Sequence, residues 1–154
     1  MQQTVAKQVW KDINVGSLDF HQTKSIIRSS VFLKEMFFPN GQFDKLKARL
    51  VAGGDQMDRS LYGKVSSPAV SLESVFISAV LAALEGRHIS TMDISGAFLN
   101  ADMSGEMVYD RLDKRVPTFL LEFDPEGAAF INPDGTIAVQ LLRGMCGCIQ
   151  CSLL

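Results

Sequence analysis

The sequence predicts an α+β fold with a mixed or antiparallel sheet, because segments typical of strands and of a helix alternate along the chain. The first observation is a hairpin signature, in which two strand-like runs flank Pro39-Asn40-Gly41. The second is a helical run from Leu72 to Glu85, which Ser71 can cap and Gly86 can end. The third is a set of later strand-like runs, at residues 87–93, 106–112, 119–123 and 136–142.

The predicted hairpin carries a cationic face. If Asn40-Gly41 forms a two-residue turn, Lys34 lies opposite Lys47 and Phe32 lies opposite Arg49. Side chains alternate along a strand, so the cations share one face and apolar residues the other: Lys34, Lys45, Lys47 and Arg49 against Leu33, Leu46, Ala48 and Leu50. Opposed like charges destabilise a hairpin, so this face suits a bound anion. The alternative is a solvated strand face whose lysines point into water.

The remaining elements fill in this plan. Residues 1–25 are polar and are expected to form a short helix or irregular lead-in anchored by Trp10, so that the domain proper spans 26–154. The helical run is apolar nearly all round, which predicts that it is buried on more than one side. Residues 132–135, with the sequence Asn-Pro-Asp-Gly, are predicted to join the last two strand-like runs into a second hairpin.

Bulk properties exclude several classes of protein. A chain of 154 residues with 47% hydrophobic residues fits one domain with a real core. A net charge of −2 gives no global attraction to nucleic acid, so a polyanionic partner must meet a local patch. No run approaches the ~18 apolar residues of a membrane span, and the polar start lacks a secretory core. We therefore expect an intracellular protein, cytoplasmic or nuclear, that is not secreted and has no membrane partner.

One acidic residue occupies a position that needs an explanation. Asp93, in the stretch TMDISGAFLN, ends an apolar run and is followed by small residues and Phe98. An ionised carboxylate is costly away from water, so it should be solvated, paired or holding a cation. A magnesium ion takes one or two carboxylates and fills its other positions with water and phosphate oxygens, which the cationic hairpin could also hold. The alternatives are a helix N-cap or an ion pair with Arg87 or His88, and for Phe98 a place in the core.

The three cysteines lie together near the end of the chain, at positions 146, 148 and 151. Their odd number and their crowding argue against a disulfide framework spread through the fold. Three thiolates could hold zinc or copper, but a closed structural zinc site uses four ligands. The final residues, Cys-Ser-Leu-Leu, also match a prenylation signal, although no polybasic stretch precedes them.

Several segments together resemble the reverse transcriptase of copia-type retrotransposons, in order and in approximate spacing. The opening strands are similar at Val9-Trp10 and at residues 26–43. The most specific segments are KLKARLVAGGDQ (45–56), SSPAV (66–70), TMDISGAFLNADM (91–103), EMVYDRL (106–112) and LLRGMCGCIQCS (141–152). The resemblance implies the fingers hairpin and an incomplete ferredoxin-like palm of an RNA-directed DNA polymerase, with an RNA/DNA template-primer and deoxynucleotide triphosphates as partners.

The resemblance also implies roles for residues at matching positions. Asp93 would be the catalytic, first metal-binding aspartate of the palm, and the backbone carbonyl of Ile94 would be a second ligand of Mg²⁺. Lys47 and Arg49 would contact the nucleotide triphosphate, and Lys45 would do so more weakly.

Two further positions would act on the nucleotide. Phe98 resembles the aromatic gate that excludes the ribose 2′-hydroxyl of a wrong nucleotide. Gln150 lies where the family places a polar side chain that positions nucleotide or template.

The chain also departs from the family. The palm needs further aspartates from a Tyr-x-Asp-Asp hairpin, and none occurs before Leu154, so two-metal catalysis lacks most of its ligands. Cys146 stands where a tyrosine is usual and Gly144 where an alanine is usual. We therefore expect a polymerase fragment that is inactive alone; the alternative is a non-catalytic module of the same fold that binds nucleic acid or protein. An interrupted palm would also leave an open sheet edge that favours self-association.

Overall fold

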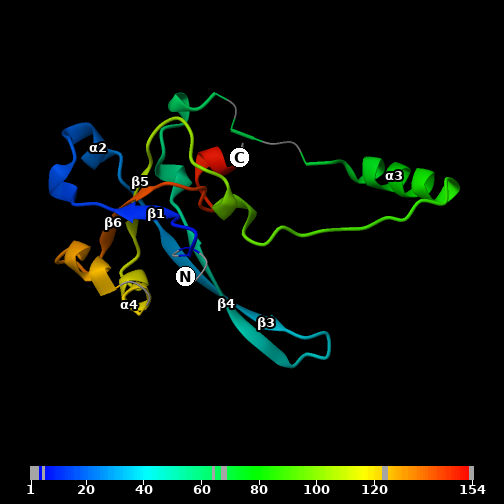
Figure 1. Ribbon diagram of the computed structural model, residues 1–154, viewed down its shortest axis with the longest axis horizontal. Helices are drawn as coiled ribbons and strands as arrows, with labels where there is room; N and C mark the ends of the chain where they lie inside the picture. The colour runs from blue at the N-terminus through cyan, green and yellow to red at the C-terminus, as the bar shows by residue number, and fades with distance from the viewer. Residues whose placement is uncertain (1–3, 5, 64, 67–68, 123–124, 153–154) are drawn as a thin grey trace.

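The structure is a computed structural model that describes residues 4, 6–63, 65–66, 69–122 and 125–152. A four-stranded sheet in the order β1-β6-β5-β2 forms the body of the molecule (Figure 1). Its strands are β1 (Trp10–Asp12), β2 (Ile27–Arg28), β5 (Tyr109–Leu112) and β6 (Ile137–Leu141). Strand β6 pairs antiparallel with β1 and β5, whereas β2 runs parallel to β5. The predicted α+β class with a mixed sheet is confirmed.

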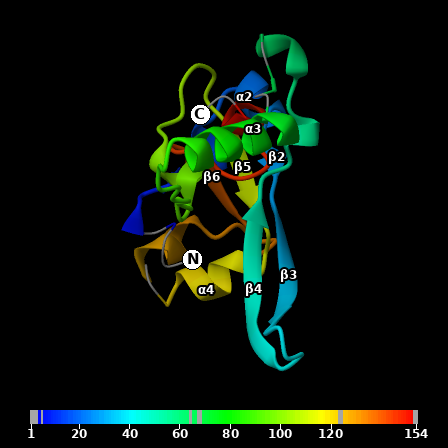
Figure 2. The ribbon, with the colours of Figure 1, turned by 90° about the vertical axis from the view of Figure 1, so that its right-hand side faces the viewer.

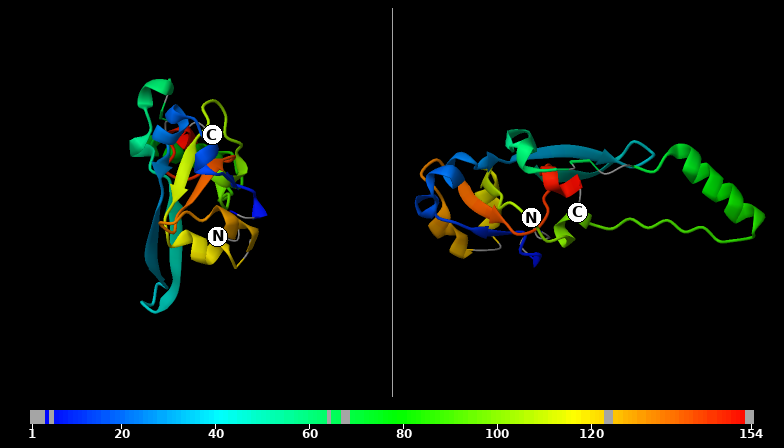
Figure 3. Two further views of the ribbon diagram at one scale, coloured as in Figure 1. Left: turned by 90° about the vertical axis from the view of Figure 1, so that its left-hand side faces the viewer. Right: turned by 90° about the horizontal axis from the view of Figure 1, so that it is seen from above.

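Helices and 3₁₀ turns connect the strands. The α-helices are α2 (Phe20–Lys24), α3 (Leu72–Leu84) and α4 (Val116–Leu120). The 3₁₀ turns are η1 (Val15–Ser17), η2 (Gly54–Gln56), η3 (Arg59–Leu61), η4 (Ala97–Asn100), η5 (Pro125–Phe130) and η6 (Ile149–Ser152). Helix α4 and turn η5 lie together beside the sheet, at the end opposite the C-terminal segment (Figure 3).

The hydrophobic core lies between the sheet and the segments that cover it. Leu112 and Val139 of the central strands are fully buried, and Val116 of α4 is equally inaccessible. Met145 and the thiols of the C-terminal segment belong to the same cluster. Each fully buried side chain of this size contributes about 1.5–3 kcal/mol through the hydrophobic effect, so this cluster dominates the stability of the body.

The long hairpin formed by β3 (Ser30–Phe37) and β4 (Phe43–Val51) projects from the body (Figures 1 and 2). Its register pairs Lys34 with Lys47 and Phe32 with Arg49, which confirms the predicted pairing. Side chains on both faces of its outer part are exposed. The hairpin is therefore an arm whose inner end alone touches the core.

The turn of this hairpin differs from the prediction. The Phe38 amide donates to the Gln42 carbonyl over 2.9 Å, which leaves a three-residue loop, and Gly41 adopts a φ of +81°. Phe37 pairs with Phe43 after a register shift, and the two rings meet edge to face with centroids 6.1 Å apart. The two-residue turn is thus wrong by one residue, because the ring contact and the left-handed glycine favour the longer loop.

The inner end of the hairpin is fastened to the C-terminal segment. Val31 and Leu50 pack against the core, and the Ala52 amide donates to the Cys146 carbonyl over 2.8 Å. A Cβ added at Gly54 would lie closer than 3.0 Å to the backbone oxygen of Gly147. Because the two backbones approach this closely, the loop after β4 and the segment before η6 form one tight junction.

Helix α3 confirms the predicted helical run. The Ser71 hydroxyl accepts a hydrogen bond from the Ser74 amide at its start, and Gly86 follows its end with a φ of +65°. The prediction that it is buried on more than one side is wrong, because none of its residues is buried. Figures 1 and 3 show the helix held away from the sheet at the end of a second arm, so the described elements do not cover its apolar faces.

Two of the predicted strands are not strands. Residues 87–93 pair with no strand of the described chain, and an isolated segment cannot form a sheet. Of the run 119–123, residues 119 and 120 belong to α4 and Phe123 lies outside the described residues. Pro117 in the first turn of α4 explains the helix, since proline is tolerated at a helix start. The predicted turn at 132–135 is present, because the Asn132 amide donates to the Thr136 carbonyl over 2.8 Å and Ile131 forms an isolated antiparallel bridge with Ile137. Its predicted first strand at 119–123 is wrong, and β6 pairs instead with β1 and β5.

The lead-in segment contributes to the sheet. Trp10 pairs with Leu141 and Asp12 with Val139, so β1 forms an edge of the sheet, and α2 supplies the expected short helix. Strand β1 is only three residues long. Its pairing with β6, more than 120 residues later, rather than its own pattern, makes it a strand.

Helix α4 is linked to the inner end of the hairpin. Arg115 donates from Nε and from its terminal nitrogen to the two oxygens of Asp113, each over 2.8 Å. These hydrogen bonds hold the pKa of Asp113 at about 2. The same guanidinium donates to the Val31 carbonyl at 3.4 Å, so it bridges α4 and β3. No helix in the described part of the chain has the length and apolar character needed to cross a membrane.

Candidate functional site

Four exposed cations share one face of the hairpin, which we term the cationic face: Lys34, Lys45, Lys47 and Arg49. Opposed residues of an antiparallel pair project to the same side, so the Lys34 and Lys47 side chains are neighbours. Phe32 and Met36 lie on either side of Lys34 along β3 and add apolar surface to the same face. The result is a strip of positive charge with an aromatic ring on it.

These cations find little compensation within the chain. Lys45 is 3.6 Å from its neighbour Asp44, an exposed ion pair of the kind that contributes almost nothing to stability. None of the ion pairs of the described residues involves Lys34, Lys47 or Arg49. Two lysines that face each other without an acid raise the energy of the free hairpin, and a bound anion would lower it.

Asp93 lies on the other arm. It is exposed, in the extended segment that leads from α3 back to the body. The segment turns at Gly96, which has a φ of +62°, and enters η4. Among the described residues, no hydrogen bond or ion pair joins Asp93 to the hairpin, and the two arms leave the body separately (Figures 1 and 3). The structure thus brings the predicted acid into water but not onto the cationic face.

The neighbours of Asp93 in the sequence are also accessible. Ile94 is 59% exposed and Phe98 is 44% exposed, so neither is a core residue. Beyond η4 the chain rejoins the body, where the Met103 amide donates to the Leu142 carbonyl and the Gly144 amide donates to the Ala101 carbonyl. Phe98, the predicted aromatic gate, therefore lies near the base of the arm, just before the point where the chain is hydrogen-bonded to the body again.

The donor set for a metal is small. Within the described residues, no three side chains of histidine, cysteine, aspartate or glutamate gather where they could hold a metal ion. Asp93 and the Ile94 carbonyl would supply two oxygens, and Asp93 belongs to no cluster of three such side chains among the described residues. The residues present do not fit a two-metal centre. The same finding gives no support to zinc or copper at the three cysteines.

Gln150 is placed differently from the other predicted site residues. It is buried, with 6% of its surface exposed, and its amide nitrogen donates to the carbonyls of Ser104 and Glu106 over 3.3 and 3.2 Å. Its side chain therefore holds the segment before β5 against η6. Neither of these hydrogen bonds joins Gln150 to the cationic face or to Asp93.

Sequence reasoning missed a buried acid, Asp110. It is inaccessible, in the middle of β5, and neither carboxylate oxygen has a hydrogen-bond partner of good geometry among the described residues. Burial raises its pKa to about 7, although the nearby Ser29 hydroxyl and backbone amides oppose the shift. Period-two alternation could have found it, because Val108 and Leu112 on the same face are both buried.

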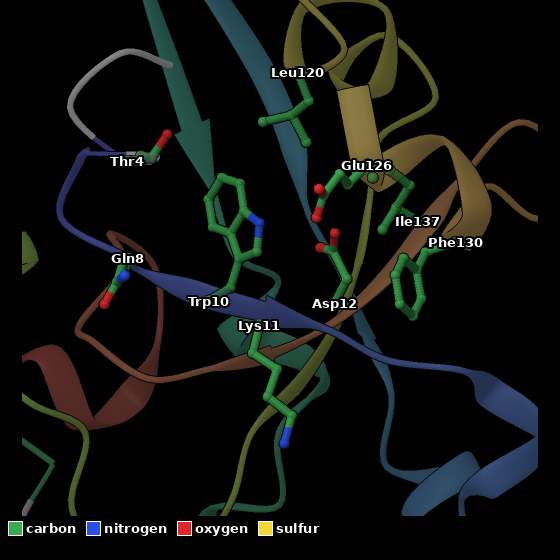
Figure 4. Close-up of a pocket in the computed structure, with 10 residues that line it drawn as sticks. Thr4, Gln8, Trp10, Lys11, Asp12, Leu120, Glu126, Phe130 and Ile137 are labelled. Atoms are coloured by element: carbon green, nitrogen blue, oxygen red, sulfur yellow. The ribbon is translucent and has the colours of Figure 1, made fainter. Parts of the chain in front are cut away.

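A cavity of about 430 Å³ lies between β1, α4 and η5. Figure 4 shows the Trp10 ring on one side of it and the carboxylates of Asp12 and Glu126 on the other, whereas Lys11 points away. None of the site residues predicted from the sequence lines this cavity. It is therefore separate from both the cationic face and the arm that carries Asp93.

Comparison with known protein families matches residues 18–124 to the family described as reverse transcriptase (RNA-dependent DNA polymerase). The chain belongs to the reverse transcriptase family. The match spans the hairpin, α3 and the Asp93 segment, and it ends before β6 and Gln150. No curated protein and no solved structure gives a significant match to the chain.

Membership in the reverse transcriptase family gives the two arms a context. Reverse transcriptases act on a nucleic acid template with nucleotide substrates and in general use a divalent metal. In this reverse transcriptase chain, the cationic face is the surface with uncompensated positive charge, and Asp93 is an accessible acid within the matched residues. The roles of individual residues remain predictions.

Proposed function

We propose that this chain is the fingers and partial palm of a copia-type reverse transcriptase, that it binds RNA or DNA through the cationic face, and that it does not polymerise by itself. The uncompensated charge of the exposed hairpin supports the binding role. The absence of a metal-holding acidic cluster among the described residues supports the lack of polymerisation.

The binding role follows from simple electrostatics. Lys34, Lys47 and Arg49 have no acidic partner in the described structure, so phosphates that reach them displace only water and counterions. If these three cations contact phosphates of a duplex, the logarithm of the affinity should fall with the logarithm of salt concentration with a slope of about −3. Phe32, on the same face and 58% exposed, offers a ring on which an unpaired base can stack.

The chemistry of polymerisation is not supported by this set of donors. In the family, magnesium would position and neutralise the phosphates of the incoming nucleotide. Here Asp93 and the Ile94 carbonyl are the proposed ligands, and a two-metal reaction needs more acidic groups than these. A binding module is therefore the function that the geometry supports best.

Binding is tested by fluorescence anisotropy with a labelled RNA/DNA primer-template at several salt concentrations. Changing Lys47 and Arg49 together to glutamine should make the salt slope less negative by about 1.8, since each lost phosphate contact removes about 0.9. The matched control changes Lys11 and Lys24, which are exposed and lie outside the hairpin, and alters the net charge equally. Equal effects of the two double variants would show that general charge, and not the cationic face, drives binding.

Polymerisation is tested by primer extension with magnesium and deoxynucleotide triphosphates. We expect no extended product from the 154-residue chain. Extension that disappears in the Asp93→Asn variant would overturn the proposal that the chain alone is inactive, and would make Asp93 a working metal ligand. Extension that survives Asp93→Asn points to a contaminating polymerase, so the chain itself is again inactive.

The exposed apolar residues of α3 favour a second function, as a protein interaction module. Phe76 and Ile77 are 61% and 60% exposed, whereas the sheet edges β1 and β2 are only three and two residues long. Self-association would therefore use α3 before it used an open edge. Analytical sedimentation of the wild type and of Phe76→Glu tests this. If both proteins are monomers at every salt concentration, α3 does not mediate self-association.

A further inference from the structure

Two of the three cysteines form a buried pair at the C-terminal segment. Cys148 and Cys151 are each 5% exposed, whereas Cys146 is exposed. The Cys151 amide donates to the Cys148 carbonyl over 3.1 Å, which closes a 3₁₀ turn. Side chains three residues apart eclipse each other in such a turn, so the two sulfurs are stacked on the same side.

The two thiols form a short hydrogen-bonded chain. The Cys148 thiol donates to the sulfur of Cys151, and Cys151 Sγ donates to the Met145 carbonyl over 2.8 Å. The shared hydrogen bond lowers the pKa of Cys151 and raises that of Cys148. The pair is thus polarised, so that Cys151 loses its proton more readily and Cys148 holds its proton more strongly.

A path from solvent reaches one member of the pair. Cys148 lines a cavity of about 570 Å³ beside the junction of the hairpin with the C-terminal segment, together with Gly54, Gly147 and the exposed Arg59. A molecule with the size of a small disulfide fits in this space. Cys151 does not line the cavity, so it lies behind Cys148 as seen from the opening.

Asp110 of β5 lies within electrostatic reach of the pair, and its negative charge is one of the causes that raise the pKa of Cys148. The other titratable groups within electrostatic reach of Cys148 in the described chain are Cys151 and Tyr62, whose pKa is raised by burial. The Asp110 carboxylate therefore opposes the ionisation of Cys148 and does not act as its base.

We propose that Cys148 and Cys151 form a reversible dithiol–disulfide site that exchanges with low-molecular-mass disulfides through this cavity. This redox site goes beyond nucleic acid binding and does not depend on it. It also lies outside the residues matched to the reverse transcriptase family.

The exchange balances in two steps. Cys151 loses its proton to water, Cys148 passes its own proton to Cys151 along the shared hydrogen bond, and the Cys148 thiolate attacks one sulfur of the small disulfide, forming a mixed disulfide and releasing one small thiolate, which takes a proton from water. Cys151 then attacks the Cys148 sulfur, forming the intramolecular disulfide and releasing the second thiolate, which takes the proton of Cys151. The protein dithiol is oxidised, and the small disulfide is reduced to two thiols.

The first test counts thiols in the full chain carrying Cys146→Ser, so that the exposed thiol cannot interfere. The folded protein is equilibrated with mixtures of oxidised and reduced glutathione, quenched in acid, denatured and alkylated. Cleavage after Arg143 places both remaining cysteines on one peptide that begins at Gly144. We expect this peptide to lose both alkylation sites in oxidising mixtures and to regain them with excess reduced dithiothreitol.

Single-cysteine variants identify the order of attack. Cys151→Ser in the same background should accumulate the glutathione adduct at Cys148, because the second step is blocked. Cys148→Ser should form the adduct much more slowly, since Cys151 does not line the cavity. Two free thiols in every glutathione mixture, in protein that is still folded by circular dichroism, would overturn the redox site.

Discussion

The junction between the hairpin and the C-terminal segment makes a sharp prediction about Gly147. This residue has a φ of +99°, and a Cβ added there would lie closer than 3.0 Å to the backbone oxygen of Ala52. A positive φ costs a residue with a side chain about 1–2 kcal/mol, and crowding in a packed region costs about 1–3 kcal/mol. Gly147→Ala should therefore lower the free energy of unfolding by about 2–5 kcal/mol.

Three other glycines separate the two causes. Gly41 has a φ of +81° with open space around it, so Gly41→Ala should cost only about 1–2 kcal/mol of backbone strain. Gly54 would meet the Gly147 backbone without a positive φ, so Gly54→Ala should cost only the crowding term, about 1–3 kcal/mol. Gly63 has open space and no positive φ, and alanine there should be neutral or stabilise by up to about 1 kcal/mol.

Urea unfolding of the reduced protein measures all four variants. The single tryptophan, Trp10, reports on the sheet because it pairs with Leu141 of β6. The four midpoints, at equal slopes, should rank Gly63→Ala highest and Gly147→Ala lowest. If Gly147→Ala unfolds within about 0.5 kcal/mol of Gly63→Ala, the backbones do not approach as described and the junction is not what holds the hairpin.

Two further predictions concern the core and the exposed arm. Between about pH 4 and pH 7 the free energy of unfolding should fall as the pH rises, because unfolded Asp110 ionises near pH 4 whereas the folded carboxyl keeps its proton to about pH 7. The total loss of unfolding free energy approaches about 4 kcal/mol. Urea unfolding at pH 5 and pH 8 measures it, and the Asp110→Asn variant should show no such fall with pH. If the variant shows the same fall, another group is responsible for it. Leu112→Ala, at a fully buried position, should cost about 2–5 kcal/mol, whereas Leu84→Ala, at a position 79% exposed on α3, should change stability by less than about 0.5 kcal/mol in the same assay. Equal losses would show that α3 packs on the body.

The parts of the fold that sequence reasoning predicted are those governed by neighbours along the chain. The hairpin register follows from the alternation of side chains around one turn, and it places Lys34 opposite Lys47 as expected. Helix α3 follows from its cap at Ser71 and its stop at Gly86. Both are local features, so no knowledge of the rest of the molecule was needed to find them.

The parts that it missed depend on distant pairing. Strand β1 forms because β6 lies beside it and pairs with it. Residues 87–93 do not form a strand, because no strand of the described chain lies beside them to pair with. Pro117 was a local signal for α4 that the β-propensity of the following residues outweighed. Asp110 is a different case, because alternation along its own strand already places it on the same buried face as Val108 and Leu112.

In the candidate nucleic acid site too, the sequence predicts the individual groups but not whether they lie close together in the fold. The pattern of residues predicts a cationic strip and an isolated acid, and both are present and accessible. Their meeting is a different matter, because two exposed charges 4 Å apart in water attract each other by only about 1 kcal/mol. Fixing the backbone of a single residue costs about as much, so charge alone cannot hold the Asp93 arm against the hairpin. A polyphosphate on the cationic face would itself repel the Asp93 carboxylate, so joining the two arms through a nucleotide requires a cation between the phosphate and Asp93.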